Sequence, residues 1–246
     1  MSLYSDFSPP GGWGGQKPPS GVQVNRLHPM AAGLIDAFVF NEQAGGNTRS
    51  ALTGEPLTLV GAAKWGACQQ GSGVVTAASG DYLASAVTNK YQIVGDEPFS
   101  AGVVVNITDS TTAGGLIGYR STYANGFWSF YKSNVSVGWM HRAEDSNVSV
   151  LWSNVYPGNG YHSFFVVKRS GASLEVFVDG ISKGVKLLST PLPVAGSQRL
   201  LLGTLSGYDT SSNTYGTYLA AYLWRRALAA HEPAMFHAQP YLMSGE

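Results

Sequence analysis

Apolar and polar residues follow patterns typical of β-strands along most of the chain, most clearly in residues 161–185. In residues 162–168 both alternating sets are apolar, and β-branched and aromatic residues dominate, as in a strand buried on both faces. After a break, residues 174–178 lead to the Asp179-Gly180 dipeptide, which tolerates the backbone of a tight hairpin turn. This stretch predicts three strands in a meander, the first of them central in its sheet.

Further strands are predicted on both sides of this meander. Residues 133–139 and Ser146–Trp152 share the pattern Ser-Asn-Val-Ser-Val-x-Trp. Because Val, Val and Trp alternate with the other residues, we expect two neighbouring strands joined by a hairpin. A short helix is predicted near residues 229–238, with Pro233 in its first turn, no capping Ser or Thr, and packing by Met235 and Phe236 to hold it. The other strands are expected at residues 34–40, 57–60, 71–84, Phe99–Ile107, 200–203 and 219–224.

Several segments carry a family resemblance, in family order. Residues 162–180, HSFFVVKRSGASLEVFVDG, resemble the signature hairpin of laminin-G-like domains in the concanavalin A-like lectin/glucanase superfamily. Other strands and the terminal helix of that domain are similar to four further segments, residues 28–46, 64–85, 200–203 and 218–243. The Lys-Pro-Pro and Trp-Arg-Arg-Ala-Leu segments, at residues 17–19 and 224–228, are similar to versions found in tailed-phage genomes. The resemblance implies an all-β, concanavalin A-like jelly-roll β-sandwich with a short C-terminal helix.

The chain divides into an arm and one large domain. Glycine and proline fill most of residues 9–21, a composition that resists helix and sheet, so residues 1–25 are predicted to form an extended N-terminal arm. Residues 26–246 are predicted to form the laminin-G-like β-sandwich. Tyr4, Phe7 and Trp13 are candidate anchors of the arm, either to a neighbouring subunit or to the arm's own domain.

Charge and composition exclude several classes of function. The 246 residues contain 15 basic and 15 acidic side chains, so no basic stripe is available for nucleic acid. No run approaches the roughly 18 apolar residues of a membrane helix, and the N-terminus lacks the features of a signal peptide. The single cysteine, Cys68, excludes an internal disulfide. We therefore expect a protein made in the host cytoplasm without a membrane or nucleic-acid partner.

Catalytic residues are not apparent in the sequence. A retaining glycosidase needs two carboxylates about 5 Å apart, so acidic residues at i and i+2 or i+4 on a strand would be expected. The pairs Asp96/Glu97 and Glu144/Asp145 are adjacent and would point to opposite faces, and Asp179, which follows Glu175 at i+4, belongs to a turn. The sequence predicts no enzyme, although a dyad assembled from distant segments stays open.

Metal binding is also not predicted. The five histidines are scattered, which disfavours zinc. Many laminin-G-like relatives carry an Asp-Glu pair on the closing strand that could supply calcium oxygens, but residues 216–220 of this chain contain no acid. Asp81 and Asp209 remain weak calcium candidates on expected loops. His162 is interpreted as a ring packed at the entrance of the central strand.

Two aromatic patches are candidates for sugar binding. A pyranose needs an exposed aromatic ring for stacking and nearby polar groups for its hydroxyls. The loop at residues 207–217 contributes Tyr208, Asp209, Asn213 and Tyr215. The second patch contains Tyr119 and Trp128, together with Tyr123 and Asn125.

Three hypotheses of function follow. The first is a non-enzymatic structural protein on the virion surface of a tailed phage, a capsid decoration protein or fibre. It would display a lectin-like sandwich and attach by its arm to other virion proteins and to sister subunits in a homo-oligomer. The alternative is a glycan-binding adhesin or lectin module that recognises surface glycans. The third is a glycoside hydrolase. The first two can coexist, because many copies of a weak glycan binder gain avidity.

Overall fold

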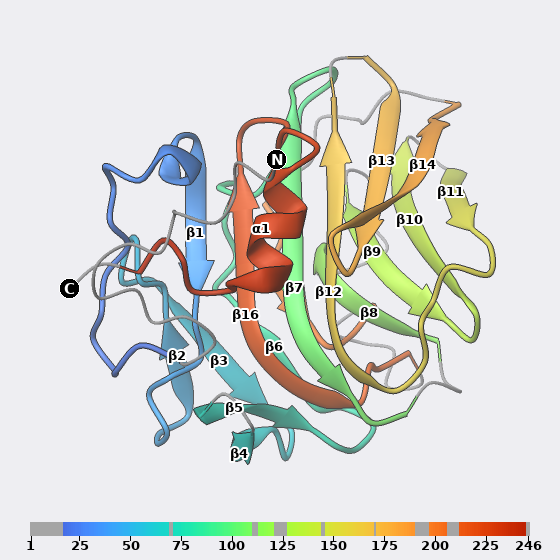
Figure 1. Cartoon of the computed structure of the whole chain (residues 1–246). Coiled ribbons are helices and arrows are strands. Elements are labelled where there is room, and N and C mark those ends of the chain that lie inside the picture. The colour runs from blue at the N-terminus through green and yellow to red at the C-terminus, as the bar shows by residue number, and fades with distance from the viewer. Residues whose placement is uncertain are drawn as a thin grey trace.

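Two antiparallel sheets packed face to face form the body of the protein, and one short helix lies against the outside of the first sheet (Figure 1). The structure, a computed structural model, describes residues 17–68, 71–109, 113–120, 127–143, 146–169, 171–189, 197–205 and 212–244. None of the helices in these ranges is long and apolar enough to cross a membrane. The predicted all-β jelly-roll sandwich with a short C-terminal helix is confirmed.

The first sheet has the strand order β14-β13-β12-β7-β16-β5-β4. Strand β16 pairs with β5 along its first half and with β1 along its second half, so β1 is an additional strand of this sheet. The strands are β1 (Leu34–Phe38), β4 (Lys64–Cys68), β5 (Gly71–Thr76), β7 (Phe99–Ile107), β12 (Gly160–Lys168), β13 (Ser173–Val178), β14 (Ile181–Leu187) and β16 (Gly216–Trp224).

The second sheet has the strand order β11-β10-β9-β8-β15-β6-β3-β2. Its strands are β2 (Asn47–Arg49), β3 (Pro56–Val60), β6 (Tyr82–Ala84), β8 (Gly114–Tyr119), β9 (Trp128–Ser133), β10 (Ser136–Ala143), β11 (Ser146–Trp152) and β15 (Leu200–Leu202). A 3₁₀ turn, η1 (Pro29–Ala31), precedes β1, and the helix α1 (Glu232–Ala238) follows β16.

Two hydrophobic clusters explain why β12 is apolar on both alternating sets. Phe164 and Val166 point into the core between the sheets, while Phe165 and Val167 belong to a second cluster on the outer face. In that second cluster Phe236 of α1 packs against Phe165, with ring centroids 5.6 Å apart. The two-sided burial predicted for residues 162–168 is therefore confirmed, and α1 covers the outer face of β12.

Most predicted strands are present, with two corrections. The meander β12-β13-β14 and the strand Phe99–Ile107 agree with the sequence patterns, and β10 pairs with β11. The strand predicted at residues 133–139 is shifted, because Ser133 ends β9, residues 134–135 form a tight turn and β10 begins at Ser136. Residues 71–84 form two strands, β5 and β6, which belong to different sheets. The single strand predicted there is wrong because a turn at residues 77–81 carries the chain from one layer to the other.

The C-terminal helix begins later than predicted. It starts at Glu232, not near Ala229, and the N-cap residue that precedes it, His231, makes no side-chain capping bond. Glu232 instead accepts a hydrogen bond from the Ala229 amide at 2.6 Å and forms an ion pair with Arg226 at 2.6 Å. These contacts hold residues 229–231 in a turn. The expected packing by Phe236 is confirmed, since this ring is fully buried.

The described part of the N-terminal segment lies against the sandwich. The Asn25 amide donates to the Met243 carbonyl at 2.8 Å, and Val24 forms a β-bridge with Ser244. Tyr4, Phe7 and Trp13 lie outside the described residues. The division at residue 25, and the role of these three anchors, stay predictions.

Candidate functional site

Tyr119 and Trp128 are core residues, so the prediction that they contact glycans is wrong. Both point between the sheets, with exposed fractions of 0% and 1%. The Tyr119 hydroxyl donates to the Thr88 carbonyl, and the Trp128 indole donates to the Tyr91 carbonyl at 3.0 Å. Trp128 also stacks on Trp139, with centroids 5.4 Å apart. Rings enclosed in this way offer no face to a sugar.

The loop candidates give no assembled site in the described residues. Tyr208 and Asp209 lie outside these residues, and Tyr215 is half-buried. Asn213 is 1% exposed and donates to the Asp81 carbonyl at 2.8 Å, so it stabilises the fold and the prediction of a sugar contact is wrong for it.

Asp81 organises backbone turns instead of forming part of an open cation site. Its carboxylate is buried and accepts hydrogen bonds from the amides of Ala62, Ala77 and Ala78 at 2.7, 3.1 and 2.9 Å. Three N–H dipoles directed at the carboxylate compensate its charge and oppose an approaching cation. The weak calcium prediction is therefore wrong for Asp81. Within the described ranges, no three His, Cys, Asp or Glu residues gather as a metal site would need.

The turn after β1 is strained. Phe40 and Gln43 have φ angles of 45° and 65°, values that bulky non-glycine residues rarely adopt. The Phe40 carbonyl accepts hydrogen bonds from the Lys17 amine at 2.9 Å and from the Ser72 hydroxyl at 3.3 Å. The amide of Asn41 donates to two carbonyls of the N-terminal segment, at 2.7 and 3.0 Å. Strain of this kind persists only where surrounding contacts enforce it, and it is frequent at functional sites.

Lys17 is an unusual anchor for this turn. Its amine lies 6.0 Å from the centre of the Phe40 ring and 5.8 Å from that of Tyr241. Burial lowers the pKa of the Lys17 amine to about 7, although nearby Cys68 and Glu42 act in the opposite direction.

The strained turn borders a groove of about 430 Å³, which we call the arginine groove. Its walls come from three segments, residues 20–26, 39–42 and 49–54, and its charged side chains are Arg26, Glu42 and Arg49. The volume falls in the range typical of small-ligand sites.

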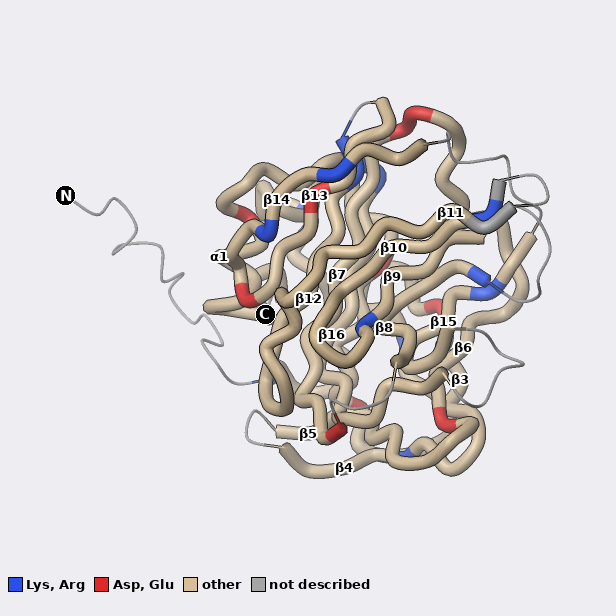
Figure 2. Tube along the Cα trace, turned by 90° about the vertical axis from the view of Figure 1, so that its right-hand side faces the viewer, with Lys and Arg blue, Asp and Glu red and all other residues tan. Residues whose placement is uncertain are grey.

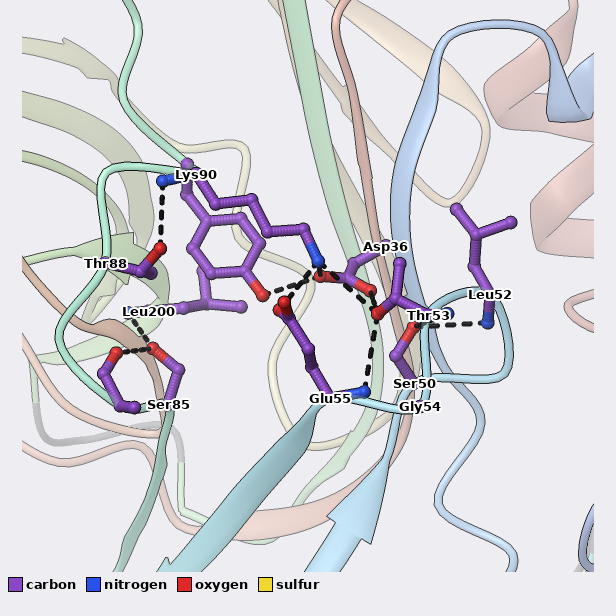
Figure 3. A network of polar contacts seen from close by, with 12 residues as sticks. Asp36, Ser50, Leu52, Thr53, Gly54, Glu55, Ser85, Thr88, Lys90 and Leu200 are labelled. Atoms are coloured by element: carbon purple, nitrogen blue, oxygen red, sulfur yellow. Dashed lines mark hydrogen bonds and ion pairs between the residues drawn. The ribbon is translucent and has the colours of Figure 1, made fainter.

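A buried polar network holds one wall of this groove in place (Figure 3). Asp36 of β1 is fully buried, and its carboxylate accepts the Thr53 hydroxyl at 2.8 Å and the Tyr91 hydroxyl at 2.6 Å. The Lys90 amine lies 2.6 Å from Asp36 and 2.7 Å from Glu55. Because Thr53 is also a wall residue, the network fixes the loop at residues 50–54. Lys90 bridges both carboxylates, an arrangement that stabilises the loop and does not resemble a glycosidase dyad open to substrate.

The strained turn also borders a second hollow of about 370 Å³, which we call the tryptophan hollow. Gln43, Trp65 and Ser72 line it together with small residues, and Gln43 directly follows Glu42 of the arginine groove. The indole N–H of Trp65 donates to the Gly45 carbonyl at 2.8 Å, which fixes the half-buried ring at the edge strand β4. The two hollows thus place an aromatic ring, amides and guanidinium groups around one turn. None of these residues is predicted as a site residue from the sequence.

A separate polar cluster joins α1 and β12 to the β13-β14 turn, because the His237 ring of α1 lies 3.1 Å from the Ser163 hydroxyl and 3.6 Å from the Asp179 carboxylate. The His162 ring lies 2.9 Å from the Asp179 carboxylate, which also accepts the Ser163 amide at 3.0 Å. Burial raises the pKa of Asp179, but the hydrogen bonds from His162 and Ser163 outweigh it and hold the pKa below its usual value. The predicted packing of His162 at the strand entrance is confirmed.

Comparisons with known proteins identify the fold. No protein-family model matches the sequence, and no curated protein matches it significantly. Among solved structures, the CBM40 domain of the Ruminococcus gnavus IT-sialidase, bound to α2,3-sialyllactose, superposes with a TM-score of 0.51 at 13% identity, covering 58% of this chain and 84% of that domain.

Two toxin domains superpose over more of the chain. The binding domain of Paraclostridial Mosquitocidal Protein 1 gives a TM-score of 0.64 at 9% identity over 84% of this chain. The ligand-binding domain of botulinum neurotoxin serotype D, solved with N-acetylneuraminic acid, gives 0.62 at 12% identity over 85%. This chain covers 52% of each toxin domain. The likeness establishes a lectin-like jelly-roll sandwich.

Proposed function

We propose that this protein is a glycan-binding module whose ligand occupies the tryptophan hollow and the adjoining arginine groove. The observation that carries the proposal is the arrangement around the strained turn, where the fixed Trp65 ring and the side chains of Gln43, Arg26 and Arg49 surround two neighbouring hollows. An aromatic ring provides a stacking surface for a pyranose, and amides and guanidinium groups donate to its hydroxyls.

The similar structures support this reading. Sialyllactose and N-acetylneuraminic acid are bound in two of them, and their domains share the sandwich of this chain. Glycan binding, the alternative hypothesis from the sequence, is therefore better supported than a virion structural role, for which these comparisons offer no support. Surface glycans are the proposed partners, and attachment to a virion stays a prediction.

A glycan array tests the proposal. The purified full chain should bind a defined set of glycans, and Trp65→Ala should weaken this binding by about fivefold or more, because loss of a stacking ring removes about 1 kcal/mol or more. Tyr131→Ala is a matched control, since Tyr131 is a half-buried ring on β9 of the other sheet. The array should be run with calcium and with chelator. The proposal would be contradicted if the folded protein bound no glycan under either condition, or if the two variants lost the same amount of affinity.

A further inference from the structure

The arginine groove carries an uncompensated positive charge. Arg26 and Arg49 are both exposed, and neither forms an ion pair with the residues that the structure describes. Arg169 and Arg226, in contrast, form ion pairs with Glu175 and Glu232, and Figure 2 marks the basic and acidic positions along the backbone. The one acidic wall residue, Glu42, accepts the Thr48 hydroxyl at 2.9 Å and the Arg49 backbone amide at 2.5 Å. The three charged side chains leave the groove with a net charge of about +1.

Both guanidinium groups are held in place before any ligand arrives. Arg26 donates to the Leu52 carbonyl at 3.1 Å, and Arg49 donates to the Gly54 carbonyl at 3.0 Å. Both carbonyls belong to the loop at residues 50–54, which the Asp36 network holds through the Thr53 hydroxyl (Figure 3). A guanidinium group has five N–H donors, so each arginine keeps donors for a ligand. Donors that are positioned in advance cost less entropy when a ligand binds.

The chemistry of these two side chains selects the class of ligand. The planar fork of a guanidinium group matches the two oxygens of a carboxylate, and such charge-assisted bonds are roughly twice as strong as neutral ones. Neutral hydroxyls would accept hydrogen bonds from the same donors with a smaller gain in binding free energy. Exposed Ser20 and Gln23, which lie on the same wall as Arg26, offer polar contacts for the rest of a sugar ring.

The geometry points to a sugar residue bearing a carboxylate as the ligand of the arginine groove, with Arg26 and Arg49 binding the carboxylate. This inference rests on the proposed glycan-binding function and specifies the ligand class for part of the same site. It assigns the two arginines to selectivity for the acidic sugar, while Trp65 supplies stacking that neutral and acidic sugars share.

The test compares an oligosaccharide ending in a carboxylated sugar with the methyl ester of the same oligosaccharide, by calorimetry on the full chain. The acid should bind at least about tenfold tighter than the ester. Arg26→Gln and Arg49→Gln should each weaken binding of the acid by about 10- to 100-fold, the usual loss for one charged hydrogen bond, and should change binding of the ester little. Arg199→Gln removes an exposed arginine outside the groove and should change affinity less than twofold.

The outcomes separate this inference from the proposed function. If the chain binds glycans through Trp65 but binds acid and ester equally, the carboxylate inference fails and the glycan-binding function stands. The inference also fails if the groove variants behave like Arg199→Gln, or if a sulfated counterpart binds more tightly than the carboxylated sugar. If the folded protein binds no glycan at all, the proposed function itself fails. Circular dichroism of each variant establishes that it is folded.

Discussion

The buried Asp36 network gives the sharpest prediction about the architecture of the site. Asp36→Asn removes the charge that Lys90 and the Tyr91 hydroxyl contact, while it preserves the shape of the side chain. Tyr91 donates as a neutral hydroxyl, because burial and the nearby Asp36 raise its pKa well above the usual range. The substitution therefore leaves Lys90 paired only with the exposed Glu55.

The magnitude follows from burial. Removing one partner of a buried ion pair costs about 3–5 kcal/mol, and the 20% exposure of Lys90 reduces this to about 2–3 kcal/mol. For a chain of this size each kcal/mol lowers Tm by about 2–4 °C, so Asp36→Asn should lower Tm by about 4–12 °C. Glu55 is 54% exposed, and Glu55→Gln should cost less than about 1 kcal/mol.

Thermal unfolding followed by circular dichroism measures both variants, and hydrogen exchange of residues 50–55 reports on the groove wall. The Asp36 variant should exchange faster there even at temperatures where the sandwich stays folded, because the Thr53 contact is weakened. If Asp36→Asn is no less stable than Glu55→Gln, the network does not hold the wall and the argument for a preformed groove is lost.

Two further substitutions test the strained turn and the helix contact. The pKa of Lys17 is about 7 in the folded chain and near 10.5 in the unfolded chain, so the unfolded state binds more protons between pH 7 and 10.5. The free energy of unfolding should therefore rise with pH across that window. Urea unfolding at several pH values should show a smaller rise for Lys17→Met, and an unchanged slope would contradict the burial of this amine. In the same assay, Gly180→Ala should lower the free energy of unfolding by about 2 kcal/mol or more, because φ is 75° and the added Cβ would lie 2.6 Å from the Ala234 Cα. Gly171 has a similar φ but open space around it, so Gly171→Ala should cost only about 1 kcal/mol. Equal losses at the two glycines would show that the helix yields to the added methyl group.

The strands were predictable because period-two patterns report burial directly. The repeated pattern in residues 133–139 and 146–152 indicated that β10 pairs with β11, although residues 133–135 form the end of β9 and the turn before β10. The doubly apolar β12 indicated a strand with layers on both sides. The same period-two rule, applied to residues 128–131, would have assigned Trp128 of the second sugar patch to the core. Trp128 and Phe130 alternate with polar Ser129 and Tyr131, which is the pattern of inward-facing core residues.

The candidate site was not predictable in this way. The arginine groove joins segments that are up to 34 positions apart, and none of them has a motif of its own. The positive φ of Phe40 leaves no trace in the sequence, since it depends on Lys17, Asn41 and Ser72 after folding. Trp65 lies on an edge strand with a mixed burial pattern, so periodicity gave no signal that its ring lines a hollow. Loops on a rigid sandwich hold the functional chemistry, and their contacts arise only from the tertiary fold.

The base of the predicted arm is also part of the candidate site, and this links the two leading hypotheses. Asn41 binds the carbonyls of Pro18 and Pro19, and residues 20–23 form one wall of the arginine groove. A chain lacking residues 1–25 would lose this wall, so failure to attach to a particle could reflect lost glycan binding as well as a lost anchor. A chain that begins at residue 17 retains the groove and its Lys17 contact, while it lacks Tyr4, Phe7 and Trp13. Only this shorter deletion separates attachment by the arm from recognition of a glycan.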